Sequence, residues 1–167
     1  QVNQQLYAGY GSHLGGGYTK IVATSLSQFE QLLAGLTRLE HLEFVSHADL
    51  LAEPCPQDRV RVAIRHDIDM DIVAALAQAQ IEQAYGVVAN WLVLHTAPYY
   101  GEFVNGVFHR HESMGHVYRR LQDLGHEVSL HTDALLLYQQ LGLDGANAIV
   151  TELEWLRGLG IDVRGTT

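Results

Sequence analysis

The hydrophobic positions of this chain follow two periods, one typical of strands and one typical of helices. Residues 59–64, Arg-Val-Arg-Val-Ala-Ile, alternate polar with apolar side chains and are rich in β-branched residues, which indicates a strand that leads into Asp69. Residues 87–94 are almost continuously apolar, as is typical of a parallel strand buried on both faces. Residues 72–85 are amphipathic at helical spacing and are followed by Gly86, a residue suited to a helix end.

Similar signals recur on both sides of this segment. Helices are expected at 28–39, capped by Ser25 or Ser27, at 114–124 and near 146–159, and the last two are followed by Gly125 and Gly160. Short strands are expected at 42–45, 128–130 and 161–164, a helical turn at 48–51, and a loop rich in aromatic and histidine residues at 97–113. Strands that alternate with helices predict βαβ units and a parallel sheet.

Ionisable residues stand where several of these strands end. Because side chains alternate faces with period 2, Asp67 and Asp69 can point the same way. Active sites of parallel sheets lie at the carboxyl ends of the strands, and this edge is expected to carry Asp67, Asp69, His95, His131 and Arg164.

Two carboxylates and an imidazole at this edge favour a divalent metal with an activated water. Oxygen and nitrogen ligands suit zinc or its first-row neighbours better than calcium. The alternative is that Asp67 and Asp69 are solvated strand ends and that His131 is a hydrogen-bonded residue of the half-buried core.

The composition limits the class of protein and its partners. A chain of 167 residues with 47% hydrophobic and 17% charged residues suits one globular domain, here 24–167, preceded by a glycine-rich lead-in at 1–23. The formal net charge of −9 argues against a nucleic-acid partner or an anionic membrane surface. No apolar stretch approaches the ~20 residues of a membrane span. A cytoplasmic location is expected, although the start at Gln1 is compatible with a removed leader. The single Cys55 has no partner for an internal disulfide.

Six segments match one known family in order. Residues 24–33 are similar to its first helix, S-x-x-x-F-E-x-x-L, residues 43–51 to the strand and turn that follow, and residues 88–93 to a central strand. His66-Asp67-Ile68-Asp69 corresponds to its first motif in a spaced D-x-D form, and residues 125–132, Gly-His-Glu-Val-Ser-Leu-His-Thr, to its second; residues 163–165 stand where the arginine of the third motif is expected. From about Thr24 to its last residue the chain thus resembles the polysaccharide deacetylase superfamily, also called carbohydrate esterase family four.

The resemblance implies a distorted (β/α)7 barrel and a metal-dependent hydrolase that removes an acetyl group from an N-acetylated sugar or polysaccharide by attack of a metal-bound water. It implies that Asp67 is the general base and that Asp69 and His131 bind the divalent metal, expected to be zinc or another first-row metal. Arg164 would pair with Asp67 and orient it, whereas His126, nearer the start of its strand, is expected to be structural. The substrate would be a carbohydrate or another small molecule, and nothing indicates an oligomeric state.

The chain departs from the family at two places. The second histidine of the second motif is replaced by Leu135, so that Asp133, His95, water, or one of the histidines at 109, 111 and 116 is left to complete the metal shell. The general acid, a histidine on a late strand, has no counterpart before Thr167, and because a closed barrel usually needs about 200 residues or more, the C-terminal part of the domain is expected to be missing from this sequence. Two other functions therefore stay open, hydrolysis of a non-sugar C–N bond and a catalytically silent glycan-binding domain.

Overall fold

The computed structural model describes residues 25–167 except 53, 55, 56 and 106. The lead-in at 1–23 and Cys55 therefore lie outside the described residues. The helices are α2 (Leu26–Leu36), α3 (His47–Ala52), α4 (Ile72–Ala84), α5 (Met114–Asp123), α6 (Ala134–Leu141) and α7 (Gly145–Gly158). The strands are β1 (Leu42–Phe44), β2 (Val60–Val62), β3 (Ile64–Ile68), β4 (Ala89–Leu94), β5 (Gly101–Val104), β6 (Val107–Arg110), β7 (Glu127–His131) and β8 (Val163–Thr166).

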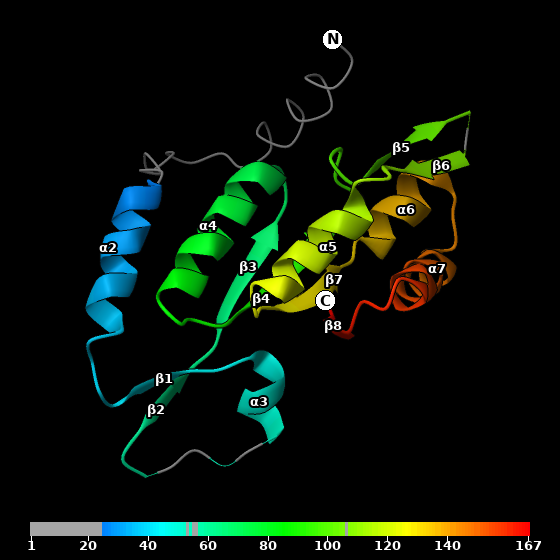
Figure 1. Cartoon of the computed structure of the whole chain (residues 1–167). Coiled ribbons are helices and arrows are strands. Elements are labelled where there is room, and N and C mark those ends of the chain that lie inside the picture. Colours follow the sequence, from blue (N-terminus) through cyan, green and yellow to red (C-terminus); the bar gives the residue numbers. More distant parts are fainter. Residues whose placement is uncertain (1–24, 53, 55–56, 106) are drawn as a thin grey trace, which may run out of the picture.

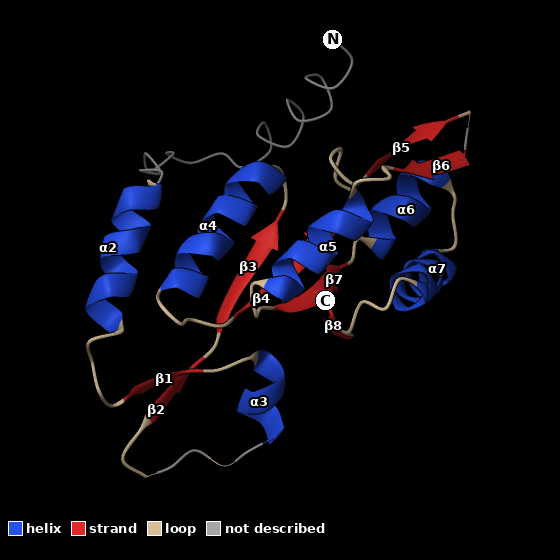
Figure 2. Cartoon of the chain, viewed as in Figure 1, coloured by secondary structure: helices blue, strands red, loops and turns tan. Residues whose placement is uncertain are grey.

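The centre of the fold is a four-stranded sheet in the order β3-β4-β7-β8, in which every neighbouring pair is parallel. Figure 2 shows this sheet behind the helices, with the short parallel pair β1–β2 and helix α3 below it. The prediction of an α/β fold with a parallel sheet is confirmed. The strands in the described part of the chain form open sheets and do not close into a barrel.

The core lies between this sheet and a row of helices. Helices α4 and α5 run across one face of the sheet, with α2 outside α4 (Figure 1). The fully buried side chains Trp91 and Val128 of the sheet pack in one cluster with Ala79 of α4 and Leu121 of α5. The ends of these helices follow local rules: Asp71 caps the start of α4, and the left-handed Gly86 and Gly125 follow the ends of α4 and α5.

The strand predicted from residue 59 onward is two strands of two different sheets. β2 pairs with β1, whereas β3 pairs with β4, and Ala63 separates them. Alternation of side chains does not reveal this break because the alternation continues across it. Ser25 caps α2 in a capping box with Gln28, which decides between the two predicted caps.

Two further elements were not predicted. The expected loop at 97–113 contains the antiparallel hairpin β5–β6, and the Asn105-Gly106 dipeptide between its strands is a known hairpin signal that the sequence interpretation passed over. Helix α6 follows His131 at 134–141, and its apolar residues are not confined to one face, since Leu135 and Tyr138 are exposed. The last strand starts at Val163, two residues later than expected, and places Arg164 inside the strand.

Candidate functional site

The face of the sheet opposite α4 and α5 carries the candidate residues, and the strand register aligns them. Asp67 of β3 is level with Leu92 of β4 and Ser129 of β7. Two residues further along, His131 is level with Leu94. Asp69 stands at the same distance beyond Asp67, directly after the end of β3. Because alternate residues share a face, Asp67, Asp69 and His131 converge at the carboxyl end of the sheet, as the sequence predicts.

The imidazole of His131 lies close to both carboxylates. Its Nε2 is 3.8 Å from Oδ2 of Asp67 and 3.7 Å from Oδ1 of Asp69. Its Nδ1 is 3.0 Å from the hydroxyl Oγ1 of Thr167, in the last part of the chain after β8. The hydrogen bond to Nδ1 leaves Nε2 directed at the two aspartates, which is how metal-binding histidines are commonly oriented.

The carboxylates and the imidazole are types of ligand that a first-row divalent metal takes in proteins. Donor atoms around a tetrahedral ion with ligands at about 2.0–2.1 Å are separated by about 3.3–3.4 Å. The distance of 3.7 Å from Nε2 to Oδ1 of Asp69 exceeds this spacing by a few tenths of an ångström, so a small side-chain rotation is needed for these two residues to bind one ion. Accordingly, no set of three or more such side chains within the described residues is already arranged to hold a metal.

Asp67 is held by Arg65, a residue that the sequence interpretation did not select. The Arg65 guanidinium donates from Nε to Oδ1 at 2.7 Å and from Nη2 to Oδ2 at 2.9 Å. This bidentate pair lowers the pKa of the Asp67 carboxyl below its usual range, so that the group stays ionised in mild acid. The signal was present, because Arg65 precedes Asp67 by two residues on the strand and therefore shares its face.

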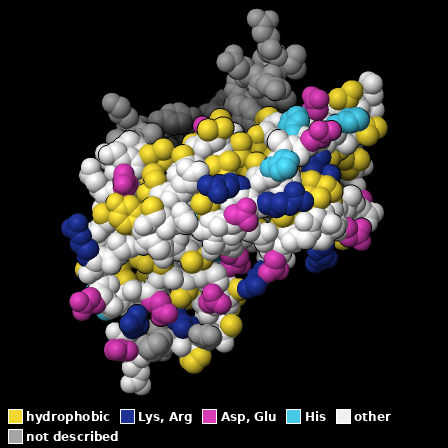
Figure 3. Space-filling model, viewed as in Figure 1, with side chains coloured by type: hydrophobic (Ala, Val, Ile, Leu, Met, Phe, Trp, Pro, Cys, Tyr) yellow, Lys and Arg dark blue, Asp and Glu magenta, His cyan; other side chains and the backbone are white. Residues whose placement is uncertain are grey.

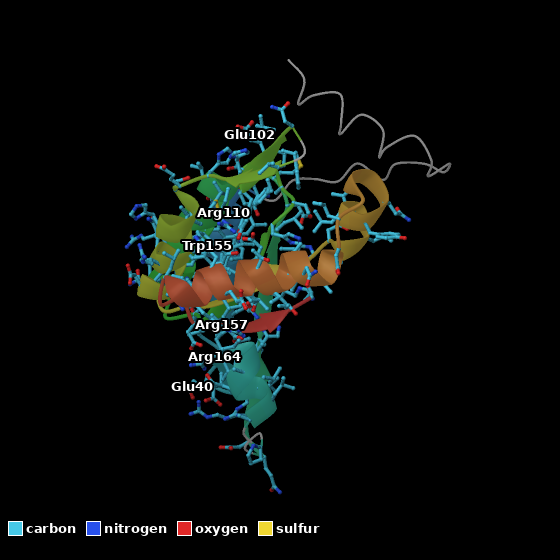
Figure 4. All side chains as sticks on the ribbon, turned by 90° about the vertical axis from the view of Figure 1, so that its right-hand side faces the viewer. Glu40, Glu102, Arg110, Trp155, Arg157 and Arg164 are labelled. Atoms are coloured by element: carbon cyan, nitrogen blue, oxygen red, sulfur yellow. The ribbon has the colours of Figure 1, made fainter. Side chains whose placement is uncertain are left out.

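Arg164 does not pair with Asp67, and the predicted contact between them is wrong. Its Nε donates to Oδ2 of Asp162 at 2.7 Å, and both side chains are exposed. In Figure 4 Arg164 lies toward the end of the molecule that carries α3, away from the carboxyl ends of the strands. The cause is the register: β8 continues to Thr166, which is level with Leu130, and a bulge separates that pair from the one formed by Val163.

The candidates for a third metal ligand have other partners. Asp133 is the N-cap of α6, where its Oδ1 accepts a hydrogen bond from the Leu136 amide at 2.9 Å. The Nδ1 of His95 is 2.9 Å from the carbonyl oxygen of His131, and its buried Nε2 has no hydrogen-bond partner in the described structure. No contact within the described residues directs the side chain of Asp133 or His95 toward the carboxylates of Asp67 and Asp69.

The histidines that follow β5 lie elsewhere. Figure 3 shows histidine side chains gathered over β5, β6 and the start of α5, and His111 and His116 line a separate hollow with Arg110 and Trp155. His126 is structural, as predicted: its Nδ1 accepts from the Ala89 amide and its Nε2 donates to the carbonyl of Ala79.

The chain matches no protein-family model, no curated protein and no solved structure in three separate comparisons. Among the described residues no helix combines the length and the apolar character that crossing a membrane requires.

Proposed function

We propose that this protein is a metal-dependent hydrolase that removes an acetyl group from an N-acetylated sugar, on a domain related to the distorted (β/α)7 barrel of the polysaccharide deacetylases. The observation that carries the proposal is the position of His131 Nε2 at the end of β7, within 3.8 Å of both carboxylates at the end of β3, although β4 lies between these two strands. The resemblance of residues 66–69 and 125–132 to the two main deacetylase motifs supports the choice of reaction.

Each residue of the site has its own proposed role. Asp69 and His131 would hold the ion, which when bound polarises a carbonyl oxygen and lowers the pKa of water. Asp67 accepts the proton of the attacking water, and Arg65 keeps it ionised and fixes the plane of its carboxylate. Thr167 holds the His131 ring in place through Nδ1. The water oxygen forms a bond to the acetyl carbon, the amide C–N bond breaks, and the proton taken up by Asp67 passes to the nitrogen, so that acetate and the free amine leave.

A catalytically silent glycan-binding domain is the second candidate. Two observations favour it: Leu135 is 63% exposed at the position of the family's second histidine, and the Asp133 carboxylate caps a helix. A site with two protein ligands is expected to hold zinc weakly, because catalytic zinc usually has three. Hydrolysis of a non-sugar C–N bond would use the same groups on another substrate.

Zinc titration of purified protein tests the metal site. We expect Asp69→Asn and His131→Gln to lower zinc affinity by about 10-fold or more, because each removes a ligand. Asp162→Asn is the matched control, since this exposed aspartate also pairs with an arginine but lies outside the site. Equal zinc affinity in the wild type and all three variants would show that Asp69 and His131 do not form a zinc site.

Acetate release from N-acetylated sugars tests the reaction. Asp67→Asn should abolish turnover and leave zinc content nearly unchanged, because it removes the base and keeps the two ligands. Full activity in Asp67→Asn would contradict the mechanism. Zinc binding without acetate release from any N-acetylated sugar would favour the silent domain.

A further inference from the structure

The two residues proposed to bind the metal lie on strands that are not neighbours. Asp69 follows β3 and His131 ends β7, and β4 runs between these strands. Adjacent strands of a sheet are about 4.8 Å apart, and two such spacings separate β3 from β7. The ligand atoms of Asp69 and His131 are nevertheless 3.7 Å apart. Their approach therefore depends on how the ends of β3 and β7 are held to the end of β4.

The end of β7 is held by the residue that follows β4. Leu94 is level with His131, and the amide of His95 donates to the carbonyl oxygen of His131 at 3.3 Å. The Nδ1 of His95 lies 2.9 Å from the same carbonyl oxygen. The backbone of His131 is thus joined directly to β4.

The end of β3 is joined to β4 through a side chain. The Leu94 amide donates to the hydroxyl oxygen of Tyr99 at 3.0 Å, and this hydroxyl donates to the carbonyl oxygen of Ile68. Ile68 is the last residue of β3 and is level with Val93, the residue before Leu94. The hydroxyl of Tyr99 therefore binds one backbone group on each strand at the last pair of their ladder.

The carbonyl that Tyr99 binds belongs to the peptide unit that leads into Asp69. Because a peptide unit is planar, a hydrogen bond that fixes the Ile68 carbonyl also fixes the direction in which the chain enters Asp69. The side chain of Asp69 is 64% exposed, so packing contributes little to its position. The hydroxyl thus holds the backbone from which the Asp69 carboxylate reaches His131.

Two successive turns bring Tyr99 back over the strand ends. The Ala97 amide donates to the Leu94 carbonyl at 3.1 Å, and the Tyr100 amide donates to the Ala97 carbonyl at 2.9 Å. The ring of Tyr99 packs against the hydrophobic core. Phenylalanine at this position would keep the packing and lose only the bridge.

We propose that Tyr99 is a positioning residue of the metal site, whose hydroxyl sets the end of β3 so that Asp69 and His131 reach one ion across β4. The proposal rests on the function proposed above. A backbone amide only donates and a carbonyl oxygen only accepts, so the bridge needs a group that does both, as a phenol hydroxyl does.

Zinc titration of Tyr99→Phe tests the proposal. We expect zinc affinity to fall by about 10-fold, the size of effect that partners orienting a ligand commonly have. Tyr100→Phe is the matched control, because it also removes a phenol hydroxyl and its hydrogen bond, here to Glu152 at 2.6 Å and away from β3. Thermal unfolding of both variants checks that the fold is kept. Wild-type zinc affinity in a folded Tyr99→Phe, or an equal loss in both variants, would overturn the proposal.

Acetate release gives a readout that a purely structural bond would not change. Since Tyr99 acts through zinc binding, Tyr99→Phe should lower turnover at limiting zinc, and saturating zinc should restore most of kcat. A deficit of the same size at limiting and saturating zinc would contradict the positioning role. If Tyr99→Phe does not fold, amide exchange of the wild type decides: zinc should slow exchange of the Leu94 amide, because coupling is reciprocal, and unchanged exchange at saturating zinc would overturn the proposal.

Crystal structures of the wild type and Tyr99→Phe separate this proposal from the proposed function. We expect the distance from His131 Nε2 to Asp69 Oδ1 to exceed 3.7 Å in the variant. This change, in a protein whose wild type binds no zinc, would keep the positioning role of Tyr99 and overturn the metal site. An unchanged position of Asp69 in Tyr99→Phe would overturn the positioning role, whether or not the wild type binds zinc.

Discussion

The candidate base Asp67 and the arginine that pairs with it, Arg65, lie on a single strand. Their bidentate contact needs no distant segment, because side chains two apart on β3 stand on one face. The side chains of both residues are more than a third exposed, so the pair adds little to the stability of the fold. Its effect is on the protonation of Asp67.

The acid limb of the pH–rate profile should therefore respond to Arg65. Because Arg65 lowers the pKa of Asp67, Arg65→Gln raises that pKa, and the fall of kcat/KM in acid should begin at a higher pH. Arg164→Gln should leave the limb in place, since Arg164 pairs with Asp162. A limb that moves in Arg164→Gln and stays in Arg65→Gln would restore the role that the resemblance implied for Arg164.

Helix α6 shows how one element can use a candidate ligand for its own start. The Asp133 carboxylate accepts from the Leu136 amide, one of the amides at a helix start that have no partner within the helix. The cap occupies Oδ1 in the described structure. The role of Asp133 as third ligand, with His95 as the rival, stays a prediction.

Two substitutions separate the cap from the ligand. We expect Asp133→Ala to lower the free energy of unfolding by about 1 kcal/mol and Asp133→Ser, which keeps a capping oxygen, to recover most of it. Urea unfolding measures this difference. Zinc titration of the same pair supplies the second measurement: a loss of about 10-fold in both variants, with none in His95→Ala, would identify Asp133 as the third ligand. Equal stability of the two variants would contradict the cap.

At the scale of the whole molecule, a buried carboxylate joins distant parts of the chain. Glu152 of α7 accepts from the Tyr100 hydroxyl at 2.6 Å and from Arg110 of β6 at 2.9 and 2.5 Å. The Arg110 guanidinium also lies 3.8 Å from the centre of the Trp155 ring. This cluster fastens the hairpin to α7, and Tyr100 and Tyr118 lie fully buried beside it.

Burial of these tyrosines predicts sensitivity to alkali. Burial raises the pKa of Tyr100 and Tyr118 far above the usual value, so both stay protonated in the folded protein. In the unfolded chain they ionise near pH ~10. The unfolded state then binds fewer protons, and the free energy of unfolding should fall above that pH by about 1.4 kcal/mol per pH unit for each tyrosine.

Urea unfolding between about pH 9 and 11 measures this slope. Tyr118→Phe removes one ionisable phenol and keeps the bond from Tyr100 to Glu152, so about half of the slope attributed to the pair should disappear. An identical slope in wild type and Tyr118→Phe would show that the phenols do not cause the alkaline loss.

The sequence by itself determined the elements of the sheet core and the meeting of the main candidate residues. Periodicity and a terminal glycine are local properties, and they predict α4, α5, β4 and β7 within a few residues. The same period of two brings Asp67 and Asp69 to one face, and parallel order then brings His131 to the same edge.

Only the tertiary structure decided which arginine holds Asp67 and where β2 separates from β3. Each depends on the register between strands far apart in the chain, where a shift of one residue sends a side chain to the other face. The bulge in β8 and its extension to Thr166 set Arg164 apart from Asp67 and leave Gly165 over Ser129. No local pattern of residues encodes such a register, because it results from packing the whole sheet at once.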